Sequence, residues 1–167
     1  MGKALDYFHE QIKNPKTPDT AKAFAAYILA LNGKLDQGEF QGLGQSYVRV
    51  NREGKLLLLL AAKEANLRRP ADLQKDLKPL LGPDITRETR WGWDEFNALS
   101  RGPALALLAA KAIMPEDPLT KQAALQLLGG LDQQGIWTST SSTGWALVAL
   151  GAYFHNQKFG AGTQEVT

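Results

Sequence analysis

Two pairs of neighbouring carboxylates are the residues of this chain that could perform acid–base chemistry. Asp94 and Glu95 follow a Trp-Gly-Trp segment, and Glu116 and Asp117 lie in a turn bounded by prolines. Two carboxylates can act together as proton donor and as nucleophile or base in the hydrolysis of glycosides. Each pair also precedes an expected helix, where acidic side chains interact favourably with the helix dipole. We expect this structural role for both pairs and keep the hydrolytic role as the alternative.

The histidines and the absence of cysteine limit the other kinds of site. His9 and His155 belong to no recognisable nucleophile or metal motif, and the HExxH spacing of zinc enzymes is absent. The chain has no cysteine, which excludes disulfides, thiolate metal ligands, a cysteine nucleophile and a thioester made from this chain. We therefore expect no catalytic residue, metal or cofactor, and we expect both histidines at the surface or at helix ends.

Four tryptophans, Trp91, Trp93, Trp137 and Trp145, all lie in the second half of the chain. They could line a ligand groove. Trp137 and Trp145 flank an expected helix start and Trp93 precedes an apolar helix, so we expect them to fasten loops onto helices instead. The Gly129-Gly130 pair matches no phosphate-binding loop and is expected to end a helix.

Composition excludes several classes of partner. The net charge is +2, the charged fraction is 22% and the basic residues are dispersed, so no nucleic-acid surface is expected. The most apolar run, Leu56–Ala62, is much shorter than the roughly 20 residues that cross a bilayer, so this segment should not insert into a membrane. The first residues lack the apolar core of a signal peptide. If the protein is exported, we expect the chain to be an excised piece.

The pattern of apolar residues predicts eight helices. They fall at about 4–13, 20–31, 38–50, 55–67, 71–81, 103–114, 119–131 and 144–154. Asp19 or Thr20 should cap the second helix, and Thr140, Ser141 or Ser142 should cap the last one, after a tight turn that starts at Gln133. Two stretches are not expected to be helical: a short β-prone loop around 85–93, and an exit strand or tail at 159–167.

The expected helices alternate in character. Four of them, at about 20–31, 55–67, 103–114 and 144–154, are apolar nearly all round and should be buried, whereas the others carry one polar face. Such alternation is typical of a two-layer ring or stack of helical hairpins. The sequence therefore predicts an all-α, α/α-toroid-like domain over 1–158, complete or incomplete.

Several motifs in the second half resemble the end of the thioester domain of bacterial α2-macroglobulins. Gly135-Ile136-Trp137-Thr138-Ser139-Thr140, followed by Gly144–Leu150 and Tyr153, is similar to its W-x-S/T-T segment and final A-x-x-A-L helix. Upstream features agree in order over most of 15–155. They are Pro18–Ala21, Tyr27 with Leu29–Leu31, the Leu-rich helix at 56–62, the Trp loop at 91–93, Arg101–Leu108 and Pro115–Pro118.

The resemblance implies an α/α-toroid within a large periplasmic or cell-surface proteinase trap. It also implies neighbouring β-domains in the same chain and proteinases as partners of the parent protein. Thioester-bearing members capture the proteinase through a Cys-x-Glu-Gln segment. This chain departs there, because it has no cysteine and Asp132-Gln133-Gln134 is not that motif. The thioester then lies upstream of Met1, or the protein belongs to a branch without one.

Two alternatives stay open beside the trap module: an α/α-toroid enzyme of the glycoside hydrolase or cyclase type, and a helical-repeat binding scaffold. Gly135-Ile136-Trp137 is similar to the end of the Q-x-x-x-G-x-W element of terpene cyclases. Leu131 stands where that element has Gln, and no Asp-rich acid motif accompanies it. This likeness supports a toroid and gives no support to cyclase chemistry.

Overall fold

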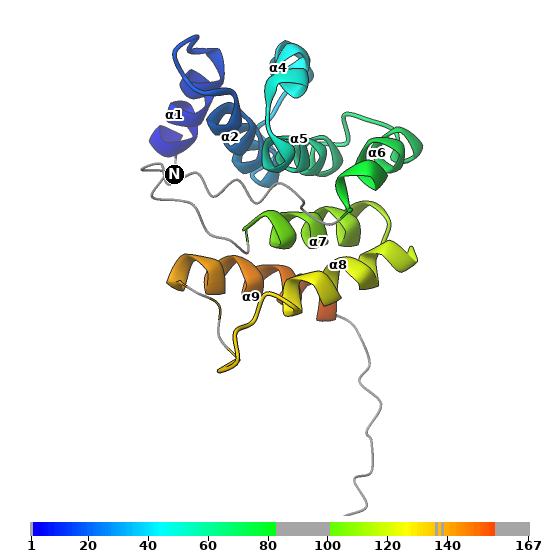
Figure 1. Cartoon of the computed structure of the whole chain (residues 1–167). Coiled ribbons are helices and arrows are strands. Elements are labelled where there is room, and N and C mark those ends of the chain that lie inside the picture. The colour runs from blue at the N-terminus through cyan, green and yellow to red at the C-terminus, as the bar shows by residue number, and fades with distance from the viewer. Residues whose placement is uncertain (1, 83–100, 136, 138, 156–167) are drawn as a thin grey trace, which may run out of the picture.

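The computed structural model describes residues 2–82, 101–135, 137 and 139–155 (Figure 1). The described residues are all-α, and none of them lies in a strand. The expected β-prone loop at 85–93 and the tail at 159–167 lie outside them. The helices are α1 Gly2–Lys13, α2 Asp19–Leu31, α3 Gln37–Gly42, α4 Gly44–Arg49, α5 Arg52–Glu64, α6 Pro70–Leu77, α7 Arg101–Ile113, α8 Pro118–Leu128 and α9 Thr140–Phe154, with a 3₁₀ helix, η1, at Lys78–Leu80.

Four of these helices form a central row. α2 packs on α5, α5 on α7, and α7 on α9; Figure 1 shows α7 between α5 and α9. The other helices flank the row: α1 packs against α2, α4 and α6 against α5, and α8 against α7. The row contains the four helices that the sequence predicts to be apolar nearly all round. The predicted alternation of helices is therefore confirmed as an alternation between the row and its flanks.

Small residues and leucines explain how the row packs. Leu56–Ala62 of α5 is buried throughout. α2 and α7 each bury four alanines and α5 buries two, and these small residues let neighbouring helices approach closely. α7 separates two apolar clusters. Its Leu105 belongs to the cluster shared with α2 and α5, and its Leu107 to the cluster shared with α8 and α9. None of the described helices is long and apolar enough to cross a membrane.

Gly54 of α5 lies directly against the side chain of Val50. A Cβ at Gly54 would lie 2.7 Å from the Cβ of Val50, which is itself 5% exposed. We expect Gly54→Ala to lower the free energy of unfolding by about 1–2 kcal/mol, because overpacking outweighs the better helix propensity of alanine. Chemical denaturation measures this loss. Gly42→Ala, whose Cβ meets nothing within 4 Å, is the control; equal stability of the two variants would contradict the prediction.

The single helix predicted at 38–50 is wrong, because the chain forms α3 and α4 with a break at Leu43. Glycines on both sides of Leu43 weaken the helix. Leu43 is 3% exposed, so burial of its side chain fixes the break. The helix predicted at 71–81 ends early as α6, and Pro79 lies in the following η1 turn. The expected end of α8 at a glycine is confirmed, since Gly129 is its C-cap.

Both predicted N-caps are wrong. Ser139, one residue before the expected candidates, accepts a hydrogen bond from Ser142 N at 3.1 Å, and its extended backbone suits a cap. Pro18 occupies the cap position of α2 without a side-chain bond. Asp19 instead accepts hydrogen bonds from Ser46 and Arg49 of α4. Its side chain, which was expected to cap α2, therefore makes a tertiary contact.

The burial predicted for the last helix is also wrong in part. α9 buries Ala146, Ala149 and Leu150, but Leu147 and Val148 are each 60% exposed. α9 ends the central row, so one of its sides has no neighbouring helix of the row in the described structure.

Candidate functional site

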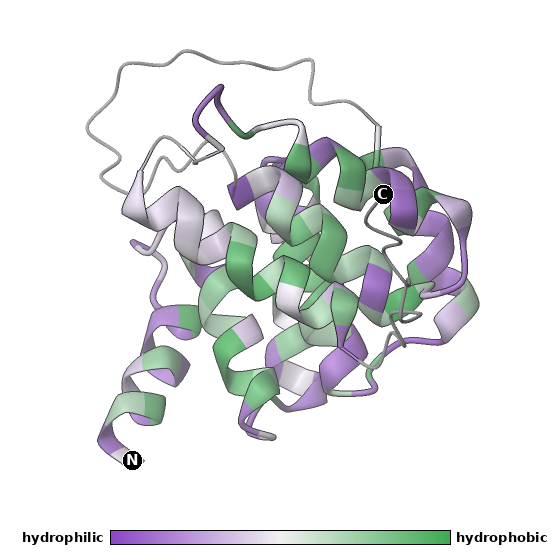
Figure 2. Cartoon of the chain, turned by 90° about the horizontal axis from the view of Figure 1, so that it is seen from below, coloured by the Kyte–Doolittle hydropathy of each residue, from purple (hydrophilic) through white to green (hydrophobic). Residues whose placement is uncertain are grey.

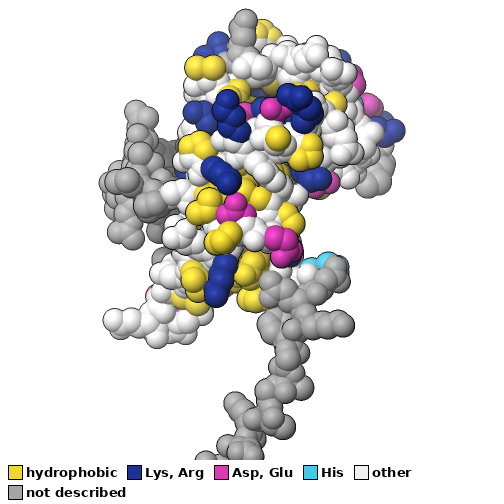
Figure 3. Space-filling model, turned by 90° about the vertical axis from the view of Figure 1, so that its right-hand side faces the viewer, with side chains coloured by type: hydrophobic (Ala, Val, Ile, Leu, Met, Phe, Trp, Pro, Cys, Tyr) yellow, Lys and Arg dark blue, Asp and Glu magenta, His cyan; other side chains and the backbone are white. Residues whose placement is uncertain are grey.

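The carboxylates Glu116 and Asp117 line a groove of about 600 Å³ at the junction of α7, α8 and the end of α9. The other residues with polar side chains that line it are Lys111, Lys121, Tyr153 and His155. The structure thus brings one predicted acid pair and one of the two histidines to the same groove. Figure 3 shows a side of the molecule on which acidic and basic side chains are interspersed with hydrophobic ones. No large field of one sign appears on that face.

Asp117 has a structural role in this groove. Its Oδ1 accepts from Leu119 N at 3.0 Å and caps α8, and its Oδ2 lies 3.3 Å from Lys78 Nζ. The turn is held as well by Thr120, whose Oγ1 donates to Met114 O at 2.8 Å. The expectation that this acid pair serves a helix start is therefore confirmed for Asp117. Glu116 beside it is exposed, and of the two carboxylates it is the better candidate for acid–base chemistry.

The hydrogen bond from Leu119 N, and after it the contacts with Lys78, hold the pKa of Asp117 below its ordinary value of 3.8. Asp19 behaves alike: its hydrogen bond from Ser46, followed by the contacts with Arg49, lowers the pKa of the carboxyl. Both groups are thus more acidic in the folded chain than in the unfolded chain.

We expect these two carboxylates to make stability depend on pH in the acid range. Their lowered pKa values mean that the unfolded chain binds more protons, so their contribution is present above pH 3.8 and is lost as the pH falls below it. Denaturation between about pH 6 and about pH 3 should show a loss of stability that is smaller in Asp19→Asn/Asp117→Asn. An equal loss in the wild-type chain and the variant would contradict the prediction.

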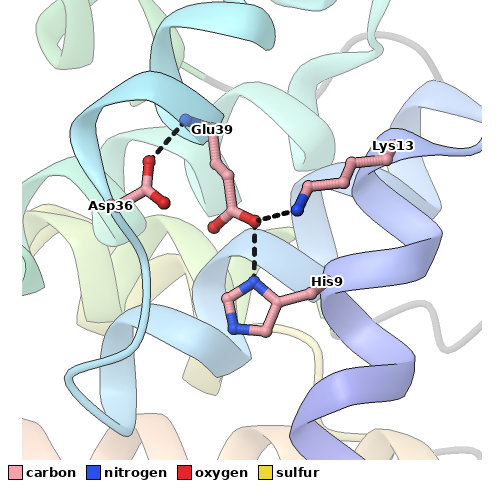
Figure 4. A network of polar contacts seen from close by, with 4 residues as sticks. All are labelled: His9, Lys13, Asp36 and Glu39. Atoms are coloured by element: carbon pink, nitrogen blue, oxygen red, sulfur yellow. Dashed lines mark hydrogen bonds and ion pairs between the residues drawn. The ribbon is translucent and has the colours of Figure 1, made fainter.

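A second cluster joins α1 to α3 (Figure 4). His9 Nδ1 lies 2.7 Å from Glu39 Oε1, and Lys13 Nζ lies 3.4 Å from the same oxygen. Glu39 N donates to Asp36 Oδ1 at 2.8 Å, which caps α3. The Glu39 side chain is only 7% exposed, and its buried Oε2 has no hydrogen-bond partner within the part of the chain that the structure describes. The cluster therefore holds a nearly buried carboxylate against two basic groups from α1.

This arrangement suits structural pairing better than metal binding. Among the described residues, no group of three or more His, Asp or Glu side chains has an arrangement that could hold a metal ion. The sequence predicts both histidines at the surface or at helix ends, which holds for His155, the exposed C-cap of α9, but His9 lies within α1, half-buried and paired with Glu39. The partners are 30 residues apart, so no local spacing in the sequence could have revealed the pair.

A third candidate is an apolar pocket of about 260 Å³ between α3, α4 and α5. It is lined by Phe40, Leu43, Gly44, Tyr47, Leu58 and Arg68. Arg68 is held by Asp76 at 2.7 Å, and burial raises the pKa of Tyr47. The pocket has room for a small apolar group. The sequence signal that could have indicated it is the pair of glycines around Leu43, where the chain breaks between α3 and α4.

The tryptophans that the structure describes fasten the chain as predicted. Trp137 packs on the cluster of α7, α8 and α9, and its Nε1 donates to Leu127 O at 3.3 Å. Trp145 contacts both apolar clusters. The turn before them is confirmed too: Gln134 N donates to Asp132 Oδ1 at 2.8 Å, and Gly135 has a positive φ of 76°. Trp91, Trp93, Asp94 and Glu95 lie outside the described residues.

Comparison of the chain with protein-family models, with curated proteins and with solved structures finds no significant match.

Proposed function

We propose that the chain is a non-catalytic helical module of a bacterial α2-macroglobulin-like proteinase inhibitor, whose parent protein traps attacking proteinases. The ordered set of motifs from Pro18 to Tyr153 carries the proposal. The parent protein would be periplasmic or exposed at the cell surface, with β-domains next to this module. Its targets would be proteinases that attack the parent.

The packing of the helices favours a structural role for the module and not a catalytic one. A row of buried helices flanked by amphipathic ones is what a stack of helical hairpins needs. Carboxylates near the candidate sites hold the fold together: Asp117 caps α8, Asp19 joins α2 to α4, and Glu39 joins α1 to α3. Such a module would position its neighbours in the parent protein and carry no chemistry of its own.

Proteinase activity in the presence of the full parent protein tests the proposal. A trapped proteinase should lose activity toward a large protein substrate and keep activity toward a small peptide substrate, because enclosure excludes only the large one. Deletion of this module from the parent should abolish the difference. Equal loss toward both substrates would contradict a trap. A parent gene that encodes no β-domains beside the module would contradict the family assignment.

One observation favours a second candidate, an α/α-toroid enzyme of the hydrolase type. Glu116 is exposed at a groove of about 600 Å³ that also contains Lys111, Lys121 and His155. A polysaccharide substrate could bind such a groove, with Glu116 as proton donor to the leaving oxygen and Asp117 as the second carboxylate, which would activate the attacking water. Release of reducing sugar by the wild-type chain and its loss in Glu116→Gln would establish this function. Lys121→Gln, on the same groove, is the control for an effect of charge alone.

A further inference from the structure

Two apolar surfaces of the described structure are not used by the proposed functions. One is the exposed side of α9. Figure 2 views the molecule from below Figure 1, the side on which α9 lies, and shows green, hydrophobic stretches on the helices there. α9 contains no Asp, Glu, Lys or Arg, so this side has no charged group that would select a partner. The other surface is the pocket between α3, α4 and α5, which has Arg68 in its wall. The pocket, and not the side of α9, therefore indicates the chemistry of an occupant.

The pocket has an apolar interior and one charged residue. Leu43 and Leu58 are buried, and with the partly buried Phe40 they form the apolar part of the lining. Arg68 lines the same pocket, and its side chain is partly exposed, so it lies toward the opening. A concave apolar surface with a few polar groups that fix the orientation of the ligand is the usual form of a small-molecule site.

The guanidinium of Arg68 is held in position by the protein. Its Nη2 donates to Asp76 Oδ2 on α6 at 2.7 Å, which ties the loop between α5 and α6 to the helix that follows. An arginine side chain has five N–H donors in a planar fork that matches a carboxylate. Within the described part of the chain, Arg68 donates to no acceptor other than Asp76. Arg68 is therefore oriented and still has donors for a ligand.

The charges around the pocket favour an anionic ligand over a neutral one. Lys55 Nζ lies 5.8 Å from the centre of the ring of Tyr47, which also lines the pocket. Burial raises the pKa of Tyr47; the charge of Asp76 raises it further, and that of Arg68 lowers it, so the ion pair acts on this ring as well. Two basic side chains and one acidic side chain thus lie around Tyr47. One positive charge is left uncompensated, and an anion would gain from it.

The volume of the pocket limits the apolar part of the ligand. A cavity of about 150 Å³ holds one benzene molecule. The pocket has about 260 Å³, which is enough for a six-membered ring and a short linker. A carboxylate at the end of that linker would reach the opening, where Arg68 lies.

We propose that the pocket binds a small monocarboxylic acid that carries one ring or a hydrocarbon group of similar size. The apolar group would lie among Phe40, Leu43 and Leu58, and the carboxylate would accept hydrogen bonds from Arg68. The site does not rest on the proteinase-trap function, and it shares no lining residue with the groove of Glu116. Because Asp76 competes for the same guanidinium and the ligand is small, we expect a dissociation constant of about 0.1–1 mM.

Titration of the whole chain with 3-phenylpropionate tests the proposal. We expect saturable shifts in the backbone amide NMR signals of the residues that line the pocket, with a dissociation constant in that range. Acetate, which lacks the apolar group, should give no saturable shift up to about 10 mM. The neutral 3-phenylpropanamide, which lacks the charge, should bind at least about tenfold more weakly than the acid. No saturable shift at the pocket, or equal binding of the acid and the amide, would overturn the proposal.

Three variants test the role of the arginine. Arg68→Gln should weaken binding of 3-phenylpropionate at least about tenfold. Arg69→Gln is the matched control, because Arg69 is the neighbour in sequence, carries the same charge, is exposed and does not line the pocket. Asp76→Asn should strengthen binding of the acid at least about twofold, because it removes the competing carboxylate, and misfolding could not produce such a gain. Equal binding by Arg68→Gln and Arg69→Gln, or weaker binding by Asp76→Asn, would overturn the proposal.

Discussion

Replacement of Leu105 by alanine is expected to lower the free energy of unfolding by about 2–5 kcal/mol. Leu105 lies on α7 with none of its surface exposed, and it belongs to the apolar cluster that α7 shares with α2 and α5. Truncation would remove buried apolar surface and leave a cavity between helices that cannot close without moving the row. Urea denaturation followed by far-ultraviolet circular dichroism measures the loss.

Leu125→Ala is the matched control for this experiment. Leu125 lies on α8 and is 58% exposed, so its truncation should change stability by no more than about 0.5 kcal/mol. The comparison separates burial from residue type, because both variants lose the same atoms from a helix. Similar losses in the two variants would mean that the central row is not the core of the protein.

Replacement of Trp145 by alanine should have the second largest effect, a loss of about 3 kcal/mol. Its indole contacts both apolar clusters, so it links the packing on the two sides of α7. Trp145 is partly exposed, which keeps the loss at the lower end for a truncated tryptophan. If the tryptophans lined a ligand groove instead, Trp145→Ala would leave the denaturation midpoint near that of the wild-type chain.

Two further variants sharpen this experiment. Trp145→Phe keeps much of the apolar surface and should lose clearly less stability than Trp145→Ala. Trp137→Phe keeps a smaller aromatic ring but removes the indole N–H that donates to Leu127 O, and should cost about 1 kcal/mol for the lost hydrogen bond. Trp145→Phe that is as unstable as Trp145→Ala would contradict a packing role, since the two variants differ mainly in buried area.

The sequence predicts the all-α class and the alternation of helices because buried helix faces require apolar residues at helical spacing. Leu56–Ala62 shows this most clearly, since an uninterrupted apolar run on a helix requires neighbours on every side. The same argument fails for Leu147 and Val148. Their exposure depends on where the row ends, and the apolar pattern of α9 carries no information about that.

The details that the sequence does not predict depend on contacts between distant residues. The break at Leu43 depends on burial of that side chain. Asp19 does not cap α2, because its carboxylate binds Ser46 and Arg49. The pairing of His9 with Glu39 joins helices that no local spacing connects. For the candidate groove, the sequence indicates Glu116 and Asp117, but only the packing of α7 and α8 beside the end of α9 brings His155 to them.

The order of the central row has a consequence for how the molecule opens. Within the row, each helix packs mainly on its immediate neighbours. The stability of each helix therefore depends mostly on the helices next to it in the row. α5 and α7 have neighbours of the row on both sides and should be the last to exchange their amide hydrogens with solvent, whereas α9 at the end of the row and α1 on its flank beside α2 should fray first.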